Sequence, residues 1–211
     1  MNPIKLVCFD LDDTLIIGVH SVMFPCILNG KEKEHAVIQQ REDEGALDYI
    51  EADYLRAKLL RGLPERLIEE KFAEYITPLA HVTTVMDVLK SKGIRTLIIT
   101  VGPEQVARIA QKRWGMDTAF GSEYKTADGI FTGEIVSHLG TVGKQTVLQK
   151  YYEEHGIKRE ECAAVGDGST DIPLFEYCGR SVALNGSAAV AEKATYTVKT
   201  DDLMDILPYI T

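Results

Sequence analysis

The stretch IKLVCFDLDDT, residues 4–14, joins an almost entirely apolar run to a cluster of acidic side chains. Ile4–Phe9 has the composition of a central strand that helices bury on both faces. The run ends at Asp10, and Asp12 follows two residues later. Ligands of an open parallel sheet bind beyond the carboxyl ends of its strands. We therefore expect a buried strand that presents Asp10 and Asp12 at a ligand-binding edge.

Further apolar runs and helical segments alternate along the rest of the chain. Strands are expected at Arg95–Thr100, Cys162–Val165 and Ser181–Leu184. Helical patterns lie before and between them, at Val82–Leu89, Glu104–Lys112, Lys144–His155 and Ile172–Tyr177. This alternation predicts an α/β fold, a Rossmann-like parallel sheet with right-handed crossovers.

Residues 16–77 do not follow this alternation. They have helical periodicity, which Pro25 and the run Gly62-Leu63-Pro64 interrupt, and they contain no convincing strand. We interpret them as a helical cap inserted after the first strand, a C1-type cap, with hinges near Ile16 and Pro78. The catalytic core is then formed by residues 1–15 and 78–211.

A hairpin is expected between Ala119 and Val136. Asp128-Gly129 lies between two alternating segments, and this dipeptide is typical of a two-residue hairpin turn. We interpret the hairpin as a small antiparallel ribbon appended to the sheet.

The composition restricts the partners. The chain has 23 Lys+Arg against 32 Asp+Glu, a formal net charge of -9, so its mean field repels nucleic acid. A phosphate substrate would need a local concentration of positive charge. The longest apolar run, Ile94–Val101, is too short to cross a bilayer, and the four cysteines have no C-x-x-C spacing. We expect a cytoplasmic protein with buried, reduced thiols and no membrane partner.

The polar residues that follow the strands form the candidate site. They are Asp10 and Asp12, Thr100, and then Asp167 and Asp171, while Lys144 opens a helix. Each has a structural explanation when taken singly, as a turn, a cap or a surface lysine. Carboxylates that converge at adjacent strand ends, however, repel one another unless a hard cation lies among them. Mg²⁺ fits this oxygen-rich set, and Lys144 adds the required positive charge.

With these motifs in order, the chain resembles the haloacid dehalogenase superfamily of phosphatases. The matching motifs are Asp10-Leu11-Asp12-Asp13-Thr14, Thr100, Lys144 and Gly166-Asp167-Gly168-Ser169-Thr170-Asp171. The resemblance implies that Asp10 is a nucleophile that forms an aspartyl phosphate and that Asp12 is the general acid and base. It also implies metal ligation by Asp10, Asp12, Asp167 and Asp171. The residues implied to bind the phosphoryl group and substrate in the core are Thr100, Val101, Gly102, Lys144 and Thr170.

Within that superfamily the chain is most similar to the phosphoserine phosphatases. In those enzymes an arginine grips the substrate carboxylate and an aromatic residue covers the site, which here implies Arg56 and Tyr49. The two are seven residues apart, so they share a helical face, away from a stripe of Leu47, Ile50 and Tyr54 expected to pack the cap. Pairing of Arg56 with Asp53 is the alternative to a substrate contact.

The chain departs from that group in several places. The amino-group-binding glutamate expected after the first motif is missing from residues 16–21, Val101 stands where glycine is usual, and Thr170 replaces asparagine. The substrate therefore stays open between phosphoserine and another small phosphorylated metabolite, such as a sugar phosphate or a methionine-salvage intermediate. A non-catalytic Mg²⁺ and phosphate-binding module is the third possibility. Both a monomer and a homodimer fit the sequence.

Overall fold

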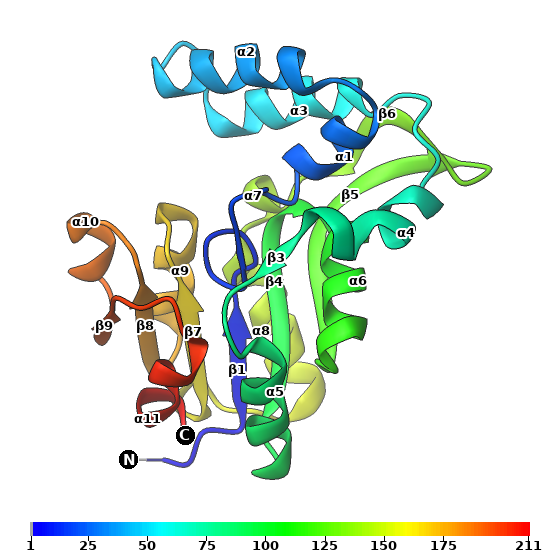
Figure 1. The fold of residues 1–211 in the computed structure, drawn as a ribbon. Helices are drawn as coiled ribbons and strands as arrows, with labels where there is room; N and C mark the ends of the chain where they lie inside the picture. Colours follow the sequence, from blue (N-terminus) through cyan, green and yellow to red (C-terminus); the bar gives the residue numbers. More distant parts are fainter. Residues whose placement is uncertain (1) are drawn as a thin grey trace.

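The computed structural model describes residues 2–211 and is built around a seven-stranded sheet. The strand order is β6-β5-β4-β1-β7-β8-β9, and only the β5–β6 pair is antiparallel. The predicted α/β Rossmann-like sheet is confirmed (Figure 1). The strands span β1 (Leu6–Phe9), β4 (Arg95–Pro103), β5 (Thr118–Ala127), β6 (Ile130–Ser137), β7 (Cys162–Gly166), β8 (Arg180–Leu184) and β9 (Tyr196–Val198).

Strand β1 lies at the centre because it pairs on both sides. Phe9 lies opposite Ile98 of β4 and opposite Val165 of β7, so the carboxyl ends of these strands adjoin. Strand β4 runs beyond the predicted end at Thr100, with a register shift between Ile99 and Pro103. Strand β9 was not predicted, since three residues carry too little periodicity to be recognised.

Alternation along β1 builds two apolar clusters, one on each face of the sheet. Val7 and Phe9 enter one cluster, whereas Leu6 and Cys8 enter the other. Burying each large side chain contributes about 1.5–3 kcal/mol before the entropy of ordering is counted. The four cysteines are buried, as expected.

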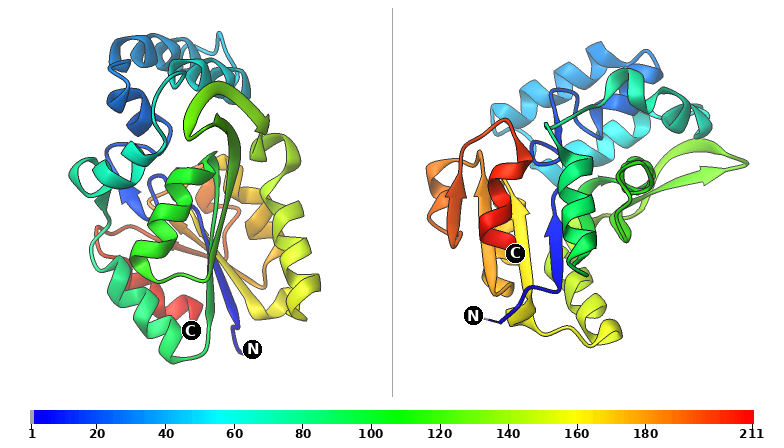
Figure 2. Two further views of the ribbon diagram at one scale, coloured as in Figure 1. Left: turned by 90° about the vertical axis from the view of Figure 1, so that its right-hand side faces the viewer. Right: turned by 60° about the horizontal axis from the view of Figure 1, so that its bottom comes forward.

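Helices cover both faces of the sheet (Figure 2). On the Val7 face lie α5 (Val82–Ser91), α6 (Glu104–Trp114), η3 (Leu203–Ile206) and α11 (Leu207–Ile210). On the Leu6 face lie α7 (Leu139–Val142), α8 (Lys144–His155), α9 (Ile172–Tyr177) and α10 (Ala188–Ala191). Short 3-10 turns, η1 (Arg159–Glu161) and η2 (Ser169–Asp171), flank β7.

The chain between β1 and α5 is mainly helical. Its ends, β2 (Ile16–Ile17) and β3 (Thr77–Pro78), pair antiparallel, which the sequence reading missed because a two-residue strand has no period. Between them lie α1 (Met23–Leu28), α2 (Glu32–Asp43), α3 (Tyr49–Leu59) and α4 (Arg66–Tyr75). Figure 1 shows α2 and α3 beyond the carboxyl ends of the strands.

Helix α3 begins at a capping box and buries an unexpected face. Asp48 accepts a hydrogen bond from the Glu51 amide at 2.9 Å, which satisfies an otherwise free donor of the first turn. The predicted apolar stripe was wrong, because Tyr54 is 42% exposed. The buried positions are Ala52, Asp53, Arg56 and Ala57, since the charges of Asp53 and Arg56 are paired inside the fold.

The predicted hairpin is confirmed as β5 and β6. Asp128 and Gly129 have φ angles of 51° and 72°, the left-handed region that this two-residue turn requires.

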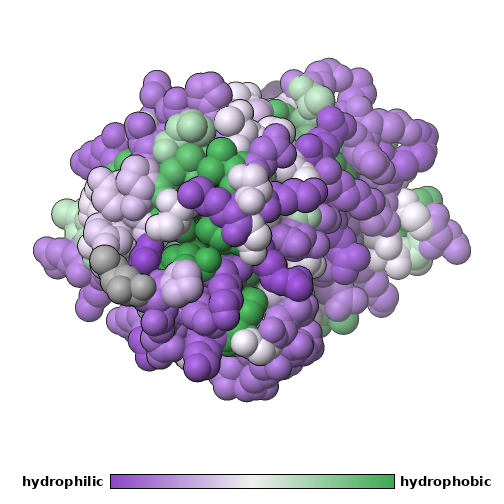
Figure 3. All heavy atoms as spheres, turned by 90° about the horizontal axis from the view of Figure 1, so that it is seen from below, coloured by the Kyte–Doolittle hydropathy of each residue, from purple (hydrophilic) through white to green (hydrophobic). Residues whose placement is uncertain are grey.

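The end of the molecule opposite α2 and α3 is mostly hydrophilic, with apolar residues gathered in a central stripe (Figure 3). Within residues 2–211, no helix combines the length and the apolar character needed to cross a membrane.

Candidate active site

Three carboxylates converge where β1 and β7 end. Asp10 follows β1, Asp167 follows β7, and Asp171 closes the η2 turn. An oxygen from each lies within 4.8 Å of the others. Burial, and then the charge of Asp171, raises the pKa of both Asp10 and Asp167, that of Asp167 to about 6. The cluster is thus a place where a cation would relieve repulsion between acids.

Lys144 brings a positive charge into this cluster from the start of α8. Its Nζ donates to Asp10 Oδ1 at 2.7 Å and to Asp171 Oδ1 at 2.6 Å, and the residue is 3% exposed. Burial alone lowers the pKa of Lys144, but Asp10 and Asp171 together raise it above its ordinary value. The lysine is therefore cationic and held in place by two buried carboxylates.

Asp12 lies apart from the cluster and is held by Ser21. The Ser21 amide donates to Asp12 Oδ1 and the Ser21 hydroxyl donates to Oδ2, both at 2.6 Å. Burial raises the pKa of Asp12, while the two hydrogen bonds from Ser21 oppose the shift. Asp12 is thereby fixed in orientation with its proton affinity increased, as a general acid requires.

The loop around Asp12 is shaped by two further contacts. Asp13 has a φ of 53° and its carboxylate lies 3.0 Å from His20 Nε2. This hydrogen bond raises the pKa of His20 to about 9. The buried Thr14 hydroxyl donates to Asp167 Oδ1 at 3.2 Å, so the first motif is tied to the last.

The predicted residues of β4 lie beside this loop. The Thr100 hydroxyl is buried and accepts from the Gly102 amide at 3.1 Å. A methyl group on Gly102 would lie 2.0 Å from Ser21 Oγ, so only glycine lets β4 approach the loop this closely. Val101 and Thr170 line the cleft described next.

A cleft of about 760 Å³ lies between the strand ends and helices α2 and α3. Asp12, His20, Tyr49 and Arg56 line it, and a smaller hollow beside it reaches Lys144. Of the predicted residues, the cleft therefore brings together Asp12, Val101, Gly102 and Thr170 of the core with Tyr49 and Arg56 of α3, while Lys144 lines the hollow beside it.

Arg56 enters this cleft with its guanidinium already hydrogen-bonded. Its Nη1 donates to Asp53 at 3.0 Å, and its Nη2 donates to Gln39 at 2.7 Å and to Glu42 at 2.5 Å. The Asp53 pairing that the sequence offered as the alternative is thus present, with Arg56 only 4% exposed. His138 Nε2 lies 3.1 Å from the second Asp53 oxygen.

Several of these residues were missed by sequence reasoning. They are Ser21, Gln39, Glu42, Asp53 as a cleft residue, and His138. In the sequence, only the spacing of residues within one helix indicates such a contact. This is why Asp53 was considered as a partner of Arg56. Contacts between separate helices leave no such pattern in the sequence.

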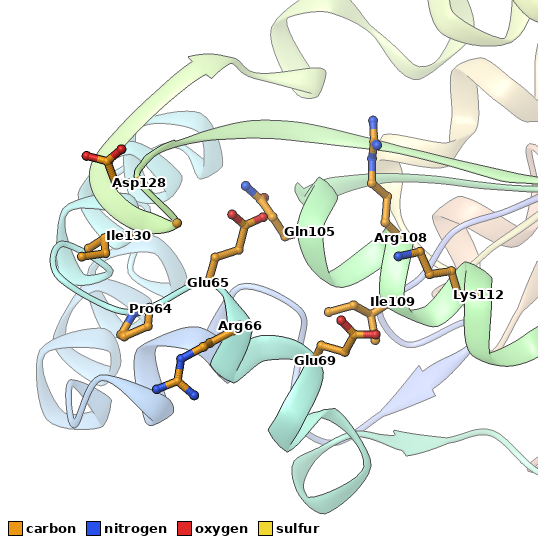
Figure 4. A pocket seen from close by; sticks show the side chains of 11 residues that line it. Pro64, Glu65, Arg66, Glu69, Gln105, Arg108, Ile109, Lys112, Asp128 and Ile130 are labelled. Carbon is orange, nitrogen blue, oxygen red and sulfur yellow. The ribbon is translucent and has the colours of Figure 1, made fainter.

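A second hollow of about 670 Å³ lies between α4, α6 and the β5–β6 turn (Figure 4). Glu65 and Glu69 line it together with Arg108 and Lys112. The lining of this hollow contains both acidic and basic side chains. The hollow lies away from the strand ends, where the carboxylates cluster. The cleft at the strand ends is therefore the candidate active site.

Comparison with known protein families agrees with this site. The haloacid dehalogenase-like hydrolase family matches residues 7–176, so the chain belongs to that family. It is an enzyme of the phosphoric monoester hydrolase class.

The proteins similar to this chain include several phosphoserine phosphatases. The phosphoserine phosphatase of Methanocaldococcus jannaschii is 30% identical over 207 residues, covering 98% of this chain and 97% of that protein. That of Streptomyces coelicolor is 28% identical, and the chain spans only 50% of its length. A solved phospho-aspartyl intermediate analogue of phosphoserine phosphatase superimposes with a TM-score of 0.84 at 28% identity and covers 100% of both chains.

Proposed function

We propose that the chain is a Mg²⁺-dependent phosphomonoesterase that transfers the phosphoryl group to Asp10 before releasing it to water. The observation that carries this proposal is the buried Lys144, which bridges Asp10 and Asp171 beside Asp167. A buried lysine among three carboxylates is poorly suited to a purely structural role, because desolvating so many charges costs stability.

The donor set fits Mg²⁺. Carboxylate oxygens of Asp10 and Asp167, with the backbone carbonyl of Asp12, would hold the ion, and Asp171 would support them. A bound cation favours the ionised forms of these acids, whose pKa values burial and mutual repulsion otherwise raise. When bound, the ion supplies Lewis-acid stabilisation of the phosphoryl oxygens.

Asp10 and Asp12 carry out two chemical steps, transfer of the phosphoryl group to Asp10 and its hydrolysis. A carboxylate oxygen of Asp10 attacks phosphorus, and the bond to the leaving oxygen breaks as Asp12 delivers its proton. Asp12, now ionised, takes a proton from water, which attacks the phosphorus and returns the Asp10 carboxylate. Ser21 orients Asp12 throughout, because it holds both carboxylate oxygens.

Binding of the phosphoryl oxygens falls to Lys144, Thr100 and Val101. Lys144 contributes its charge, and the Thr100 hydroxyl and Val101 amide contribute dipoles that need no reorganisation during the reaction. Thr170 and Gly102 line the cleft together with Val101.

The substrate we propose is O-phosphoserine, hydrolysed to serine and phosphate. Arg56 would bind its carboxylate and Tyr49 would cover it, with residues 16–77 acting as a cap that closes at the β2–β3 connection. Glu42 lines the cleft next to Arg56 and is a candidate acceptor for the substrate ammonium group. It would compensate for the missing carboxylate in residues 16–21.

A second candidate is a small phosphomonoester without a carboxylate. It is favoured by the pairing of Arg56 with Asp53 and Glu42, which already neutralises the guanidinium charge.

A substrate panel separates these candidates. Wild type and Arg56→Ala would be assayed on O-phosphoserine, sugar phosphates and a generic aryl phosphate. We expect Arg56→Ala to lose activity selectively on O-phosphoserine, by about tenfold to a hundredfold for a charged hydrogen bond. Equal activity of both proteins on O-phosphoserine would leave the second candidate as the better account.

A further inference from the structure

His138 lies between the core and α3, and its tautomer follows from its neighbours. The backbone amide of Gly140 donates to its Nδ1 at 3.1 Å, so this nitrogen carries no proton. Its Nε2 therefore carries the proton and donates to Asp53 Oδ2 at 3.1 Å. The side chain is fully buried, so this hydrogen bond is shielded from water.

Asp53 links His138 to Arg56, which lines the cleft. While Oδ2 accepts from His138, Oδ1 accepts from Arg56 Nη1 at 3.0 Å. One carboxylate of α3 thus joins a histidine of the core to the arginine proposed to bind substrate.

The segment that carries His138 is hydrogen-bonded through Ser122 to strand β4. The Leu139 amide donates to Ser122 Oγ at 2.9 Å, and that hydroxyl donates to the Val101 carbonyl at 2.6 Å. The same segment leads directly into Lys144. His138 therefore sits on a backbone whose position is set by the phosphoryl-binding residues.

Aromatic rings of α3 enclose His138 from the other side. The Tyr54 ring stacks on it at a centroid distance of 5.8 Å, and the Tyr49 ring lies at 6.1 Å. A methyl group on Gly140 would come within 2.7 Å of the Tyr49 hydroxyl. Helix α3 and residues 138–140 are in close contact over this patch.

We propose that His138 is a positioning residue whose hydrogen bond to Asp53 fixes α3, and with it Arg56, over the active site. The effect on substrate affinity rests on the proposed function, whereas the effect on α3 does not. The residue touches neither Asp10 nor Lys144 in the hydrogen bonds described, and it acts through Asp53.

Two substitutions at this one position separate its two hydrogen bonds. The amide nitrogen of His138→Gln can replace Nε2 as the donor to Asp53, whereas His138→Asn reaches only as far as Nδ1 and loses that donor. Both side chains are polar and uncharged, so each serves as the control for the other. His81→Gly removes a histidine contact to Asp202 far from the cleft, at a residue whose φ of 61° glycine tolerates, and it controls for general loss of stability.

The first readout is amide hydrogen exchange, measured by mass spectrometry on peptides of α3 and β1. We expect exchange in residues 49–59 to accelerate about tenfold in His138→Asn, as loss of a buried hydrogen bond implies, and to stay within about threefold of wild type in His138→Gln. Exchange in β1 stays unchanged. Equal exchange of α3 in wild type and His138→Asn overturns the proposal.

The second readout is steady-state kinetics on two substrates. We expect His138→Asn to raise KM for O-phosphoserine about tenfold with little change in kcat, and to leave an aryl phosphate nearly unaffected. An equal loss on both substrates overturns the proposal, because it places the effect on the core. A wild type inactive on O-phosphoserine refutes the proposed substrate, and the exchange of α3 then decides the role of His138.

Discussion

The strand-end cluster and the α3 network are both buried and charged, yet they are assembled in different ways. Asp10, Asp167 and Lys144 meet because β1 and β7 are neighbours and α8 begins beside them. Arg56 and Asp53 meet Glu42 and His138 only through the packing of separate helices and a loop. Backbone topology thus assembles the cluster proposed to carry the chemistry, while side-chain packing assembles the network proposed to recognise the leaving group.

The largest effect expected is the loss of the nucleophile. Asp10→Asn should lower kcat on an aryl phosphate by about 1,000-fold or more, because an amide cannot accept the phosphoryl group. Asp13→Asn is the matched control, because Asp13 is exposed and asparagine tolerates the same positive φ of 53°. Comparable losses in both variants would contradict the role of Asp10.

Lys144→Ala should come second and should affect both rate and stability. Removing the charge costs about 100-fold in kcat, and it leaves Asp10 and Asp171 buried without a cation, which costs about 3 kcal/mol of unfolding free energy. Kinetics and chemical denaturation measure the two effects. Lys150→Ala, an exposed position on the same helix, should change neither.

Ser21 tests the proposed role of Asp12, which lies between the strand ends and the cleft. Ser21→Ala removes one hydrogen bond that lowers the pKa of Asp12, so that pKa rises and Asp12 stays protonated to higher pH. The basic limb of the kcat/KM profile should move to higher pH, and kcat should fall about tenfold. A basic limb that stays in place would show that Asp12 is not the acid. Ser91→Ala is the control, since Ser91 is exposed and bonds only its own helix backbone.

The smallest effect concerns His20, at the rim of the cleft. Its pKa is raised from 6.5 to about 9 by Asp13, so the pair stabilises the fold fully below pH 6.5. That contribution is lost as the pH rises through about 9. Below pH 6.5, wild type should exceed His20→Gln in unfolding free energy by less than about 1 kcal/mol, because the pair is half-exposed. This difference should shrink as the pH rises from 6.5 through about 9. A difference that grows with pH would contradict the assigned ion pair.

Sequence alone predicted the region that topology controls. Asp10, Thr100 and Asp167 could be placed together because strand ends of a parallel sheet share an edge, and Lys144 was added to them as the positive charge that a phosphate site requires. The inward face of α3 could not be predicted, because polar side chains such as Asp53 are buried only when partners from other elements satisfy them. Residues 138–140 and Ser21 are likewise brought to the site by loops that carry no periodic signal.

The most direct test of the proposed chemistry is to trap the phosphoryl group on Asp10. The enzyme would be mixed with an aryl phosphate and Mg²⁺, quenched in acid during turnover, and reduced with borohydride, which converts an aspartyl phosphate to homoserine. Peptide mass spectrometry then locates the product. We expect homoserine at position 10, absent from Asp10→Asn and from enzyme without substrate. Turnover without modification of Asp10, or with modification at another carboxylate, would contradict the proposed route.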